Sequence, residues 1–466
     1  MNDKKSYLKI ILLFITTIIC GIFSVYKVGV KDGATFTLSL IITIYIILNG
    51  KKNVKQSIYI FITSMPVLVT ARKLLYIDFF LMKLNFESII IIYLFVINYK
   101  TITLKIKNIF EDGKKAKTYS YLLIIFIVAS YISCIFSDEF FYSFELVTTS
   151  VFLPILLGII VVTIFNKNDL KPLLYSLILS INLSCLYGGM QMIEIGSSIS
   201  GIKSAREQLT FGYHNLNIFV NVALLVFPLL LNELLYNKST IKEKLFLIGS
   251  ILLQSAAIFL TFSRGAWLAL GIVTILILFS KRYKYVFLVI TLLGMLISPV
   301  MIPKIMGRGD SSSHFLENTS NTARLLSIVT SKEVMKDNIL GVGYGNFNKY
   351  YRNNVEKAYL TIDYDVRKHM VAPLYTMEHA HNFFLNIGVE LGIVSLIAII
   401  GIFIQRLKAC IKNYNLNRGI FVSLIIFIFI GLTTGIELNH KGVITNTYIL
   451  WILFSMITLS KSVENI

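Results

Sequence analysis

The chain is built from apolar runs that are about as long as a bilayer is thick. A hydrocarbon core of about 30 Å is crossed by roughly 20 apolar residues in a helix. Of the 466 residues, 56% are hydrophobic and 15% are charged, and the mean hydropathy is +0.74. This composition is too apolar for a soluble domain of this length. The sequence therefore predicts an all-α fold, a polytopic bundle of transmembrane helices.

About fourteen runs are candidates for spanning helices. Three of them are short, so we expect between about twelve and fourteen spans. The runs are 8–27, 34–49, 56–71, 76–98, 119–136, 146–165, 170–190, 216–235, 244–262, 265–280, 285–302, 382–404, 419–436 and 444–460. They predict an N-terminal bundle at 1–302, a large loop at 303–380 and a C-terminal helical group at 381–466.

The distribution of Lys and Arg predicts the orientation of the chain in the membrane, because these residues in short loops stay on the cytoplasmic side. With the N-terminus inside, the Lys- and Arg-rich loops at 51–55, 100–117, 238–244, 281–284 and 406–418 all fall inside. Both termini are then cytoplasmic, and the loop 303–380 is extracytoplasmic. The net charge of +19 is explained by this topology and by attraction to anionic lipid, and no nucleic-acid partner is expected.

Cysteines and metal ligands give little indication of chemistry. Cys20, Cys134 and Cys185 lie in apolar runs and Cys410 lies in a cytoplasmic loop, so none can join the extracytoplasmic loops. No zinc-binding spacing is present. We expect no metal and no cofactor.

The loop 303–380 is the one long polar segment, and loops of this length are usually functional. Its pattern predicts an amphipathic helix at 322–337, with Ser320 or Asn321 as the cap. The helix should stop before GVGYGNF at 341–347, whose Tyr344 is a candidate for contacting substrate. No strand precedes these glycines, so a tight turn is the better interpretation than a dinucleotide site.

Two arginines are candidates for binding an anion. Arg264 follows Ser263 in SRGAWLAL, at the predicted outer membrane boundary. Arg324 falls in the first turn of the expected loop helix, where a cation opposes the helix dipole unless an anion lies between them. The alternatives are an arginine that extends to the interface and an ordinary solvated arginine.

Two histidines stand immediately before the twelfth run, in EHAHN. His379, His381 and the adjacent Asn382 are candidate site residues, because histidine can move protons near neutral pH. A capping or interfacial histidine is an equally good interpretation. Glu390 is nine residues beyond His381, which in a helix places it about 13 Å away, so it is not expected to orient His381.

A further polar segment precedes the eighth run. It could contact sugar hydroxyls or phosphate, although a simple helix cap by Asn215 is the plainer interpretation. Its candidate residues are Lys203, Arg206, His214, Asn215 and Asn217.

In their order and spacing, SRGAWLAL at 263–270, the loop arginine at 324, GVGYGNF at 341–347 and HAHNFFLNIGVELG at 379–392 resemble the O-antigen ligase and polymerase superfamily of bacterial membrane proteins. The resemblance covers roughly residues 200 to 436. It implies a GT-C-like helical bundle in the bacterial cytoplasmic membrane. It also implies an undecaprenyl-diphosphate-linked saccharide as donor and a glycan or lipid-linked molecule as acceptor.

Carried over to this chain, the resemblance assigns Arg264 and Arg324 to the diphosphate and His381 to catalysis, with His379 beside it. The three groups should then converge on one cavity at the outer face. The chain departs from the family pattern at Ile328, where a tryptophan is common, at Leu340, where a proline often precedes the turn, and at Leu216 within N-P-N. These departures weaken any choice of substrate.

The resemblance implies a metal-independent, inverting glycosyl transfer. A ligase and a repeat-unit polymerase differ only in acceptor, and the sequence does not separate them. A transporter of lipid-linked saccharide would show paired repeats and mid-membrane polar residues, whereas the polar residues here gather at one face. An inactive structural or sensory protein would not bring the arginines and histidines together.

Overall fold

The structure is a computed structural model. It describes residues 30–75, 77–79, 82–111, 114–196, 198, 201–202, 205–213, 215–279, 283, 285, 289, 315–317, 319–371, 376–433 and 445–460. The expected span at 8–27 lies outside the described residues, and so does nearly all of 285–302.

Long apolar helices dominate the described residues, which confirms the all-α polytopic bundle. Within them, ten helical segments are long and apolar enough to cross a membrane, and 265–278 and 447–460 form shorter apolar helices. The helices are α2 (Val30–Gly50), α3 (Val54–Ala71), α4 (Phe86–Glu111), α5 (Lys114–Ile135), α6 (Phe140–Val147), α7 (Leu153–Ile164), α8 (Leu170–Ile195), α10 (Leu216–Tyr236), α11 (Ile241–Leu260), α12 (Arg264–Leu278), α14 (Thr319–Asp337), α15 (Phe347–Leu360), α16 (Tyr364–Arg367), α17 (Phe383–Lys412), α18 (Tyr414–Thr433) and α19 (Thr445–Ser460). Short helical turns are η1 (Arg72–Leu74), η2 (Thr148–Phe152), η3 (Lys167–Asp169), η4 (Arg206–Gln208) and η5 (Phe315–Glu317).

The start of the fourth expected span is wrong in one respect. Residues 77–84 form an antiparallel hairpin of β1 (Ile77–Phe79) and β2 (Met82–Leu84), and the helix begins only at Phe86. Asp78 pairs with Lys83 in this hairpin. Charged residues are costly in hydrocarbon, so Asp78 and Lys83 in the sequence argue against a spanning helix over this stretch.

The chain forms two compact units, each assembled from separated segments. The first contains residues 1–108, 153–219 and 441–466. Within it, α3 packs on α2 and α8, and α19 packs on α7. The α7 and α19 backbones approach closely at Gly158, whose carbonyl accepts a hydrogen bond of 2.8 Å from the Ser455 hydroxyl.

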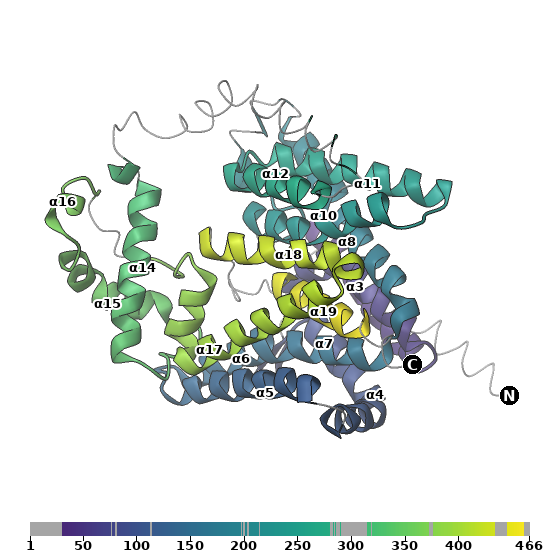
Figure 1. The fold of residues 1–466 in the computed structure, drawn as a ribbon, viewed down its shortest axis with the longest axis horizontal. Coiled ribbons are helices and arrows are strands. Elements are labelled where there is room, and N and C mark those ends of the chain that lie inside the picture. Colours follow the sequence, from purple (N-terminus) through teal and green to yellow (C-terminus); the bar gives the residue numbers. More distant parts are fainter. Residues whose placement is uncertain are drawn as a thin grey trace. The chain divides into compact units, whose positions relative to one another are not determined.

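The second unit contains residues 109–152 and 220–440. Its central helix is α17, which packs on α5 and α18, and α18 in turn packs on α12 (Figure 1). Small residues permit these approaches: a Cβ on Gly401 would lie 3.1 Å from the Leu122 side chain of α5. Near the end of α18, a Cβ on Gly431 would lie 3.2 Å from Phe383, the first residue of α17.

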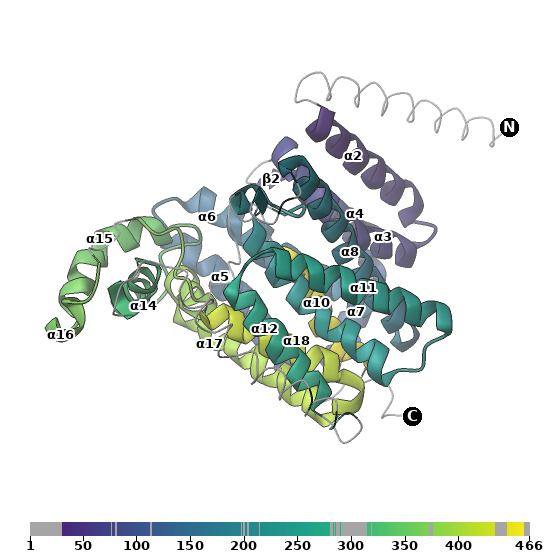
Figure 2. The same cartoon turned by 90° about the horizontal axis from the view of Figure 1, so that it is seen from above.

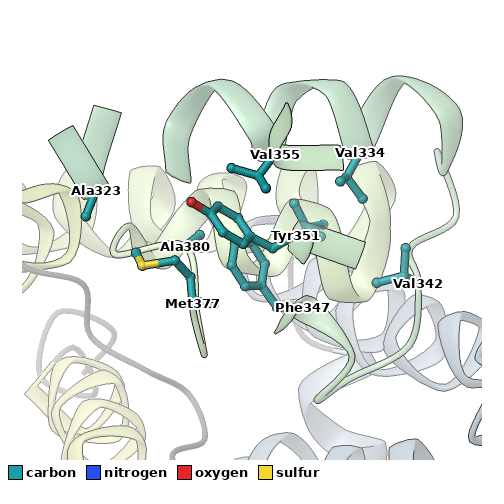
Figure 3. Packing of buried hydrophobic residues seen from close by; sticks show 9 residues of the cluster. Ala323, Val334, Val342, Phe347, Tyr351, Val355, Met377 and Ala380 are labelled. Atoms are coloured by element: carbon teal, nitrogen blue, oxygen red, sulfur yellow. The ribbon is translucent and has the colours of Figure 1, made fainter. Parts of the chain in front are cut away.

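The segment expected as a large loop is mostly helical where it is described. Helices α14, α15 and α16 lie together beside the start of α17 (Figures 1 and 2). Their core joins α14, α15, the 341–347 turn and α17 (Figure 3). Its buried members are Ala323, Val334, Val342, Phe347, Tyr351, Val355, Met377, Ala380 and Val389.

Helix α14 begins at Thr319, three residues before the predicted start. Ser320 and Asn321 therefore lie inside the helix, and their prediction as caps is wrong. The hydroxyl of Thr322 donates to the carbonyl of Leu316 (2.6 Å), which ties the first turns to η5. The buried face is also more polar than predicted, since Thr322, Ser327, Thr330 and Ser331 are buried beside Leu326.

Candidate functional site

The two histidines of the HAHN motif lie in a tight turn at the start of α17. Their rings meet edge to face, with centroids 4.4 Å apart and planes inclined by 62°. His381 has φ 48°, in the left-handed region. A residue other than glycine pays of order 1–3 kcal/mol there, so the surrounding structure must hold the turn.

Asn382 holds the turn from its C-terminal side. It is the N-cap of α17, and its side-chain oxygen accepts hydrogen bonds from the backbone N–H groups of Phe384 (3.0 Å) and Leu385 (3.1 Å). Such a cap satisfies N–H groups that the first turn leaves unpaired. Asn382 therefore fixes the position where the histidine turn ends and α17 begins, and its contact with substrate stays a prediction.

Asn386 holds the turn from the other side. Its side-chain oxygen accepts a hydrogen bond of 3.0 Å from the N–H of Ala380, the residue between the two histidines. Its amide nitrogen donates to Oε2 of Glu390 at 2.8 Å. The second carboxylate oxygen, Oε1, accepts from the N–H groups of Gly345 (3.0 Å) and Phe347 (3.1 Å). A continuous hydrogen-bonded path thus links the GVGYGNF turn to the histidine turn.

The GVGYGNF turn is fastened to a break in α17. Gly392 has φ 87° and ψ 167°, which interrupts the helical hydrogen bonds. The carbonyls of Val389 and Glu390, which the break frees from helical hydrogen bonding, accept from the N–H groups of Val342 and Gly343, each at 3.0 Å. Side chains are excluded at this contact, because a Cβ on Gly341 would lie 2.5 Å from the Glu390 carbonyl oxygen.

Polar side chains from α6 and from the connection between α5 and α6 hold the other face of this turn. The Asn346 amide donates to the hydroxyls of Ser137 (2.8 Å) and Ser143 (3.0 Å), and Ser143 donates to the carbonyl of Tyr344 (2.9 Å). The Tyr344 side chain is buried, 1% exposed. This burial helps to anchor the turn, and contact of Tyr344 with substrate stays a prediction.

Arg324 is carried to the vicinity of the histidine turn by α14. Its side chain is exposed, and its neighbour Ala323 packs in the same core as Ala380 and Met377 (Figure 3). Because α14 begins at Thr319, Arg324 lies in the second turn and not the first. The dipole argument made from the sequence is therefore weaker, whereas the exposure of the guanidinium suits ligand binding.

Arg264 is the first residue of α12, and Ser263 is its N-cap residue. The Ser263 side chain makes no capping hydrogen bond, while its carbonyl accepts from the N–H of Trp267 at 3.1 Å. The side chain of Arg264 lies outside the described part of the chain. Its helix reaches α17 through α18. Convergence of Arg264 with Arg324 and His381 stays a prediction.

The polar segment before α10 belongs to the first compact unit, and Lys203 and His214 lie outside the described residues. Asn215 caps α10 by accepting from the N–H of Ile218 at 3.0 Å, which agrees with the plainer of the two interpretations. Arg206 lies in η4, and Asn217 is exposed. Binding of substrate by these residues stays a prediction.

Backbone strain is found in three segments that also contain or adjoin candidate site residues. In the described part of the chain, three residues other than glycine have positive φ: Phe211, Phe262 and His381. Phe211 is in TFGYHN, Phe262 directly precedes Ser263, and His381 is in HAHN. Strain of this kind persists where function requires a geometry that the surroundings then enforce.

Sequence reasoning missed the role of Glu390 and Asn386. The available signal was the spacing of the two residues, four apart within an apolar run, which places an amide and a carboxylate on one helix face. As a direct partner of His381, Glu390 is too far along the helix, so its distance in sequence does not indicate this role. The connection through Asn386 and the Ala380 backbone depends on the turn conformation, which spacing does not reveal.

These features define a class: an integral membrane protein made of many apolar helices, with a candidate site built on polar turns at helix ends. Residues 249–400 match the family model described as O-antigen ligase. The chain is 25% identical over 345 residues to the O-antigen ligase of Salmonella typhimurium, covering 67% of this chain and 78% of that protein. It is 32% identical over 185 residues to a Rickettsia felis protein provisionally named a polysaccharide ligase, covering 38% and 42% of the two chains.

The match over residues 249–400 and the similarity to both ligases support a relationship to the O-antigen ligase superfamily. This confirms the resemblance that the motifs indicated. It also favours a glycosyltransferase-type enzyme of the membrane. The matched segment 249–400 contains Arg264, Arg324, both histidines and Glu390.

Proposed function

We propose that the protein transfers a saccharide from undecaprenyl diphosphate to an acceptor hydroxyl during the assembly of a surface polysaccharide, as a ligase. The observation that carries the proposal is the strained His379–His381 turn, held from both sides and packed in one core with the arginine-bearing α14. The proposed location is the bacterial cytoplasmic membrane, with the site outside and both termini inside.

In the proposed reaction, the acceptor oxygen attacks the anomeric carbon of the donor sugar. The bond from that carbon to the diphosphate oxygen breaks, a new glycosidic bond forms and the configuration inverts. His381 accepts the proton of the acceptor hydroxyl as general base, a role worth about 10² to 10⁴ in rate. His379 contacts His381 edge to face and has the supporting role.

Arg264 and Arg324 stabilise the charge that develops on the departing diphosphate. A guanidinium keeps its charge at any physiological pH and can grip two phosphate oxygens at once. In sequence, Ser263 directly precedes Arg264 and Asn382 directly follows His381. The chemistry requires charge stabilisation and one base, and both are supplied by side chains without a metal ion.

The test replaces His381 in the full-length protein and measures surface glycan in a deletion strain complemented at native expression level. His381→Ala should abolish transfer, and His379→Ala should be milder. His369→Ala, a half-buried histidine of the same polar region, is the matched control and should transfer normally. Normal glycan from His381→Ala would refute the mechanism.

The same strain separates a ligase from a repeat-unit polymerase. If the deletion leaves finished polymer on undecaprenyl diphosphate, the protein is a ligase. Single repeat units on the carrier would instead show a polymerase, the alternative within the superfamily.

A further inference from the structure

We propose that Glu390 and Asn386 are positioning residues for the transfer reaction: together they fix the His379–His381 turn through a relay of hydrogen bonds that begins at the 341–347 turn. This inference rests on the proposed function. Neither residue need touch the substrate, because the relay ends on the backbone N–H of Ala380.

The hydrogen bonds of the relay have only one possible order of donors and acceptors. An ionised carboxylate is an acceptor only, and Glu390 receives two backbone N–H groups on Oε1 and the Asn386 amide on Oε2. This fixes the orientation of the Asn386 amide, since its nitrogen must face Glu390. Its oxygen then faces Ala380, whose N–H it accepts.

Both side chains are buried, so water cannot replace any of these hydrogen bonds. Glu390 is 4% exposed and Asn386 is 8% exposed. A buried polar group that loses its partner pays the full cost of its lost hydration. The carboxylate also lies at the first residues of α15, where the positive end of the helix dipole favours an anion. The two residues therefore have a single low-energy arrangement.

The far end of the relay reaches the strained residue. His381 needs support on both sides to keep φ 48°. Asn382 provides it on the helical side and Asn386 on the side of Ala380. A shift of about 1 Å in a catalytic group costs on the order of 10²-fold in rate. Precise placement of this turn therefore bears directly on turnover.

The decisive experiment exchanges the amide and the carboxylate. In Glu390→Gln, the new amide nitrogen would face the amide nitrogen of Asn386, so two hydrogen-bond donors would oppose each other. If the Asn386 amide turned over to avoid this, its nitrogen would face the N–H of Ala380, which is again a donor. In the double variant Glu390→Gln with Asn386→Asp, the new aspartate accepts from Ala380 and from the new glutamine amide. The glutamine oxygen then accepts from Gly345 and Phe347. Every hydrogen bond returns, and the total charge is unchanged from that of the native pair.

Turnover is measured with purified full-length protein in detergent, using undecaprenyl-diphosphate-linked saccharide and the acceptor glycan fraction from the source cells, and following release of undecaprenyl diphosphate. We expect Glu390→Gln to lose about 10²-fold in kcat with little change in KM. The double variant should recover most of this loss. Amide exchange followed by mass spectrometry on peptides spanning 376–386 should become faster in the single variant and return in the double variant.

A matched control exists in the same unit. Glu233 is 4% exposed and accepts a hydrogen bond from the side chain of Asn237, also four residues away, at the end of α10. Glu233→Gln should keep native turnover, because this pair lies at the predicted cytoplasmic side. A loss equal to that of Glu390→Gln would show that neutralising any buried glutamate has this effect and would overturn the proposal.

The remaining outcomes are equally decisive. If Glu390→Gln keeps native turnover, or if the double variant does not recover, the relay does not position the turn. Loss of turnover with unchanged amide exchange around Ala380 would also overturn it. His381→Ala, assayed in parallel, tests the proposed function separately: if it is active, the mechanism fails whatever Glu390 does.

Discussion

At the scale of single residues, backbone strain lies at or near the candidate site residues. Phe262 (φ 51°) stands two residues before Arg264, and His381 (φ 48°) belongs to the candidate site itself. Each such conformation costs of order 1–3 kcal/mol, which the packing around it must supply. The sequence identified the polar residues of both segments, but it did not predict strain, because φ depends on contacts made far along the chain.

The two arginines should respond differently to loss of charge and to loss of shape. Arg264→Ala and Arg324→Ala should each lower transfer by about 10² to 10³. The lysine variants should recover only part of the loss, because an ammonium lacks the planar fork that holds two phosphate oxygens. Surface glycan and donor turnover are the measurements.

Arg352→Ala provides the control for this series, because Arg352 is an exposed arginine of α15 that no motif includes. It should transfer at the native rate. If both alanine variants at 264 and 324 were as active as Arg352→Ala, these arginines would be interfacial and solvated residues, and the enzyme mechanism would lose its charge stabilisation.

At the scale of elements, the contact between the 341–347 turn and the break in α17 depends on glycine. Gly341 has φ 89°, and an added Cβ would lie 2.5 Å from the Glu390 carbonyl oxygen and 2.6 Å from the Gly392 nitrogen. Gly341→Ala should therefore destabilise the protein by about 1–3 kcal/mol and lower transfer with it. Thermal unfolding in detergent and glycan assays measure the two effects.

Gly249→Ala is the matched control. Gly249 lies inside α11, and a Cβ there would meet nothing within 4 Å. Alanine also favours a helix over glycine by about 1 kcal/mol. This variant should be as stable as the native protein or slightly more stable. Equal loss from both substitutions would mean that the close contact at Gly341 does not hold the turn.

A surface ion pair connects α15 to the turn between α5 and α6. Lys349 lies 2.8 Å from Asp138, and the Tyr350 hydroxyl donates to the same carboxylate at 3.3 Å. The hydrogen bond and the charge of Lys349 hold the pKa of Asp138 below its ordinary value. A lowered pKa means that the contribution to stability is present above the unfolded pKa and is lost as pH falls through the folded value.

We therefore expect the native protein to lose some stability on acidification below the ordinary pKa of aspartate, about 4, and Asp138→Asn to lose less over the same range. The pair is exposed, so its effect near neutral pH should be small. Unfolding temperatures of both proteins across acidic pH measure the difference. Identical acid profiles would show that the Asp138 pair does not contribute.

What the sequence predicted at this scale follows from how local each signal is. The spans were largely correct, because hydropathy is a sum over neighbouring residues. The hairpin at 77–84 was missed, because Asp78 and Lys83 are separated in an apolar run and only their pairing shows that the run is split. Helix α14 starts at Thr319, and its first turns are tied to η5 by the hydrogen bond from Thr322 to Leu316. No capping residue in the sequence indicates this contact.

The site was predicted in part for the same reason. Arg264, Arg324 and His381 stand in recognisable motifs, so they could be selected from the sequence. Asn386 and Glu390 act through backbone groups of other segments, at Ala380, Gly345 and Phe347. The contacts with Gly345 and Phe347 require the 341–347 turn to lie against the break of α17 at Gly392, and the spacing of residues does not predict this arrangement.

At the scale of the whole molecule, the distribution of cations makes one prediction on which the mechanism depends. Loops rich in Lys and Arg should lie in the cytoplasm, which places α14, α15 and the histidine turn outside. Asn353 is exposed on α15, and Lys242 is exposed near the start of α11. The two positions should therefore lie on opposite sides of the membrane.

The test introduces Asn353→Cys or Lys242→Cys into a variant in which Cys20, Cys134, Cys185 and Cys410 are replaced. Intact cells, or spheroplasts where an outer membrane is present, are treated with a membrane-impermeant maleimide. Asn353→Cys should label before lysis and Lys242→Cys only after it. Because α15 carries the 341–347 turn that is bonded to α17, its side of the membrane is also that of His381. Labelling of Lys242→Cys alone in intact cells would place the histidine turn in the cytoplasm, away from an extracytoplasmic donor and acceptor.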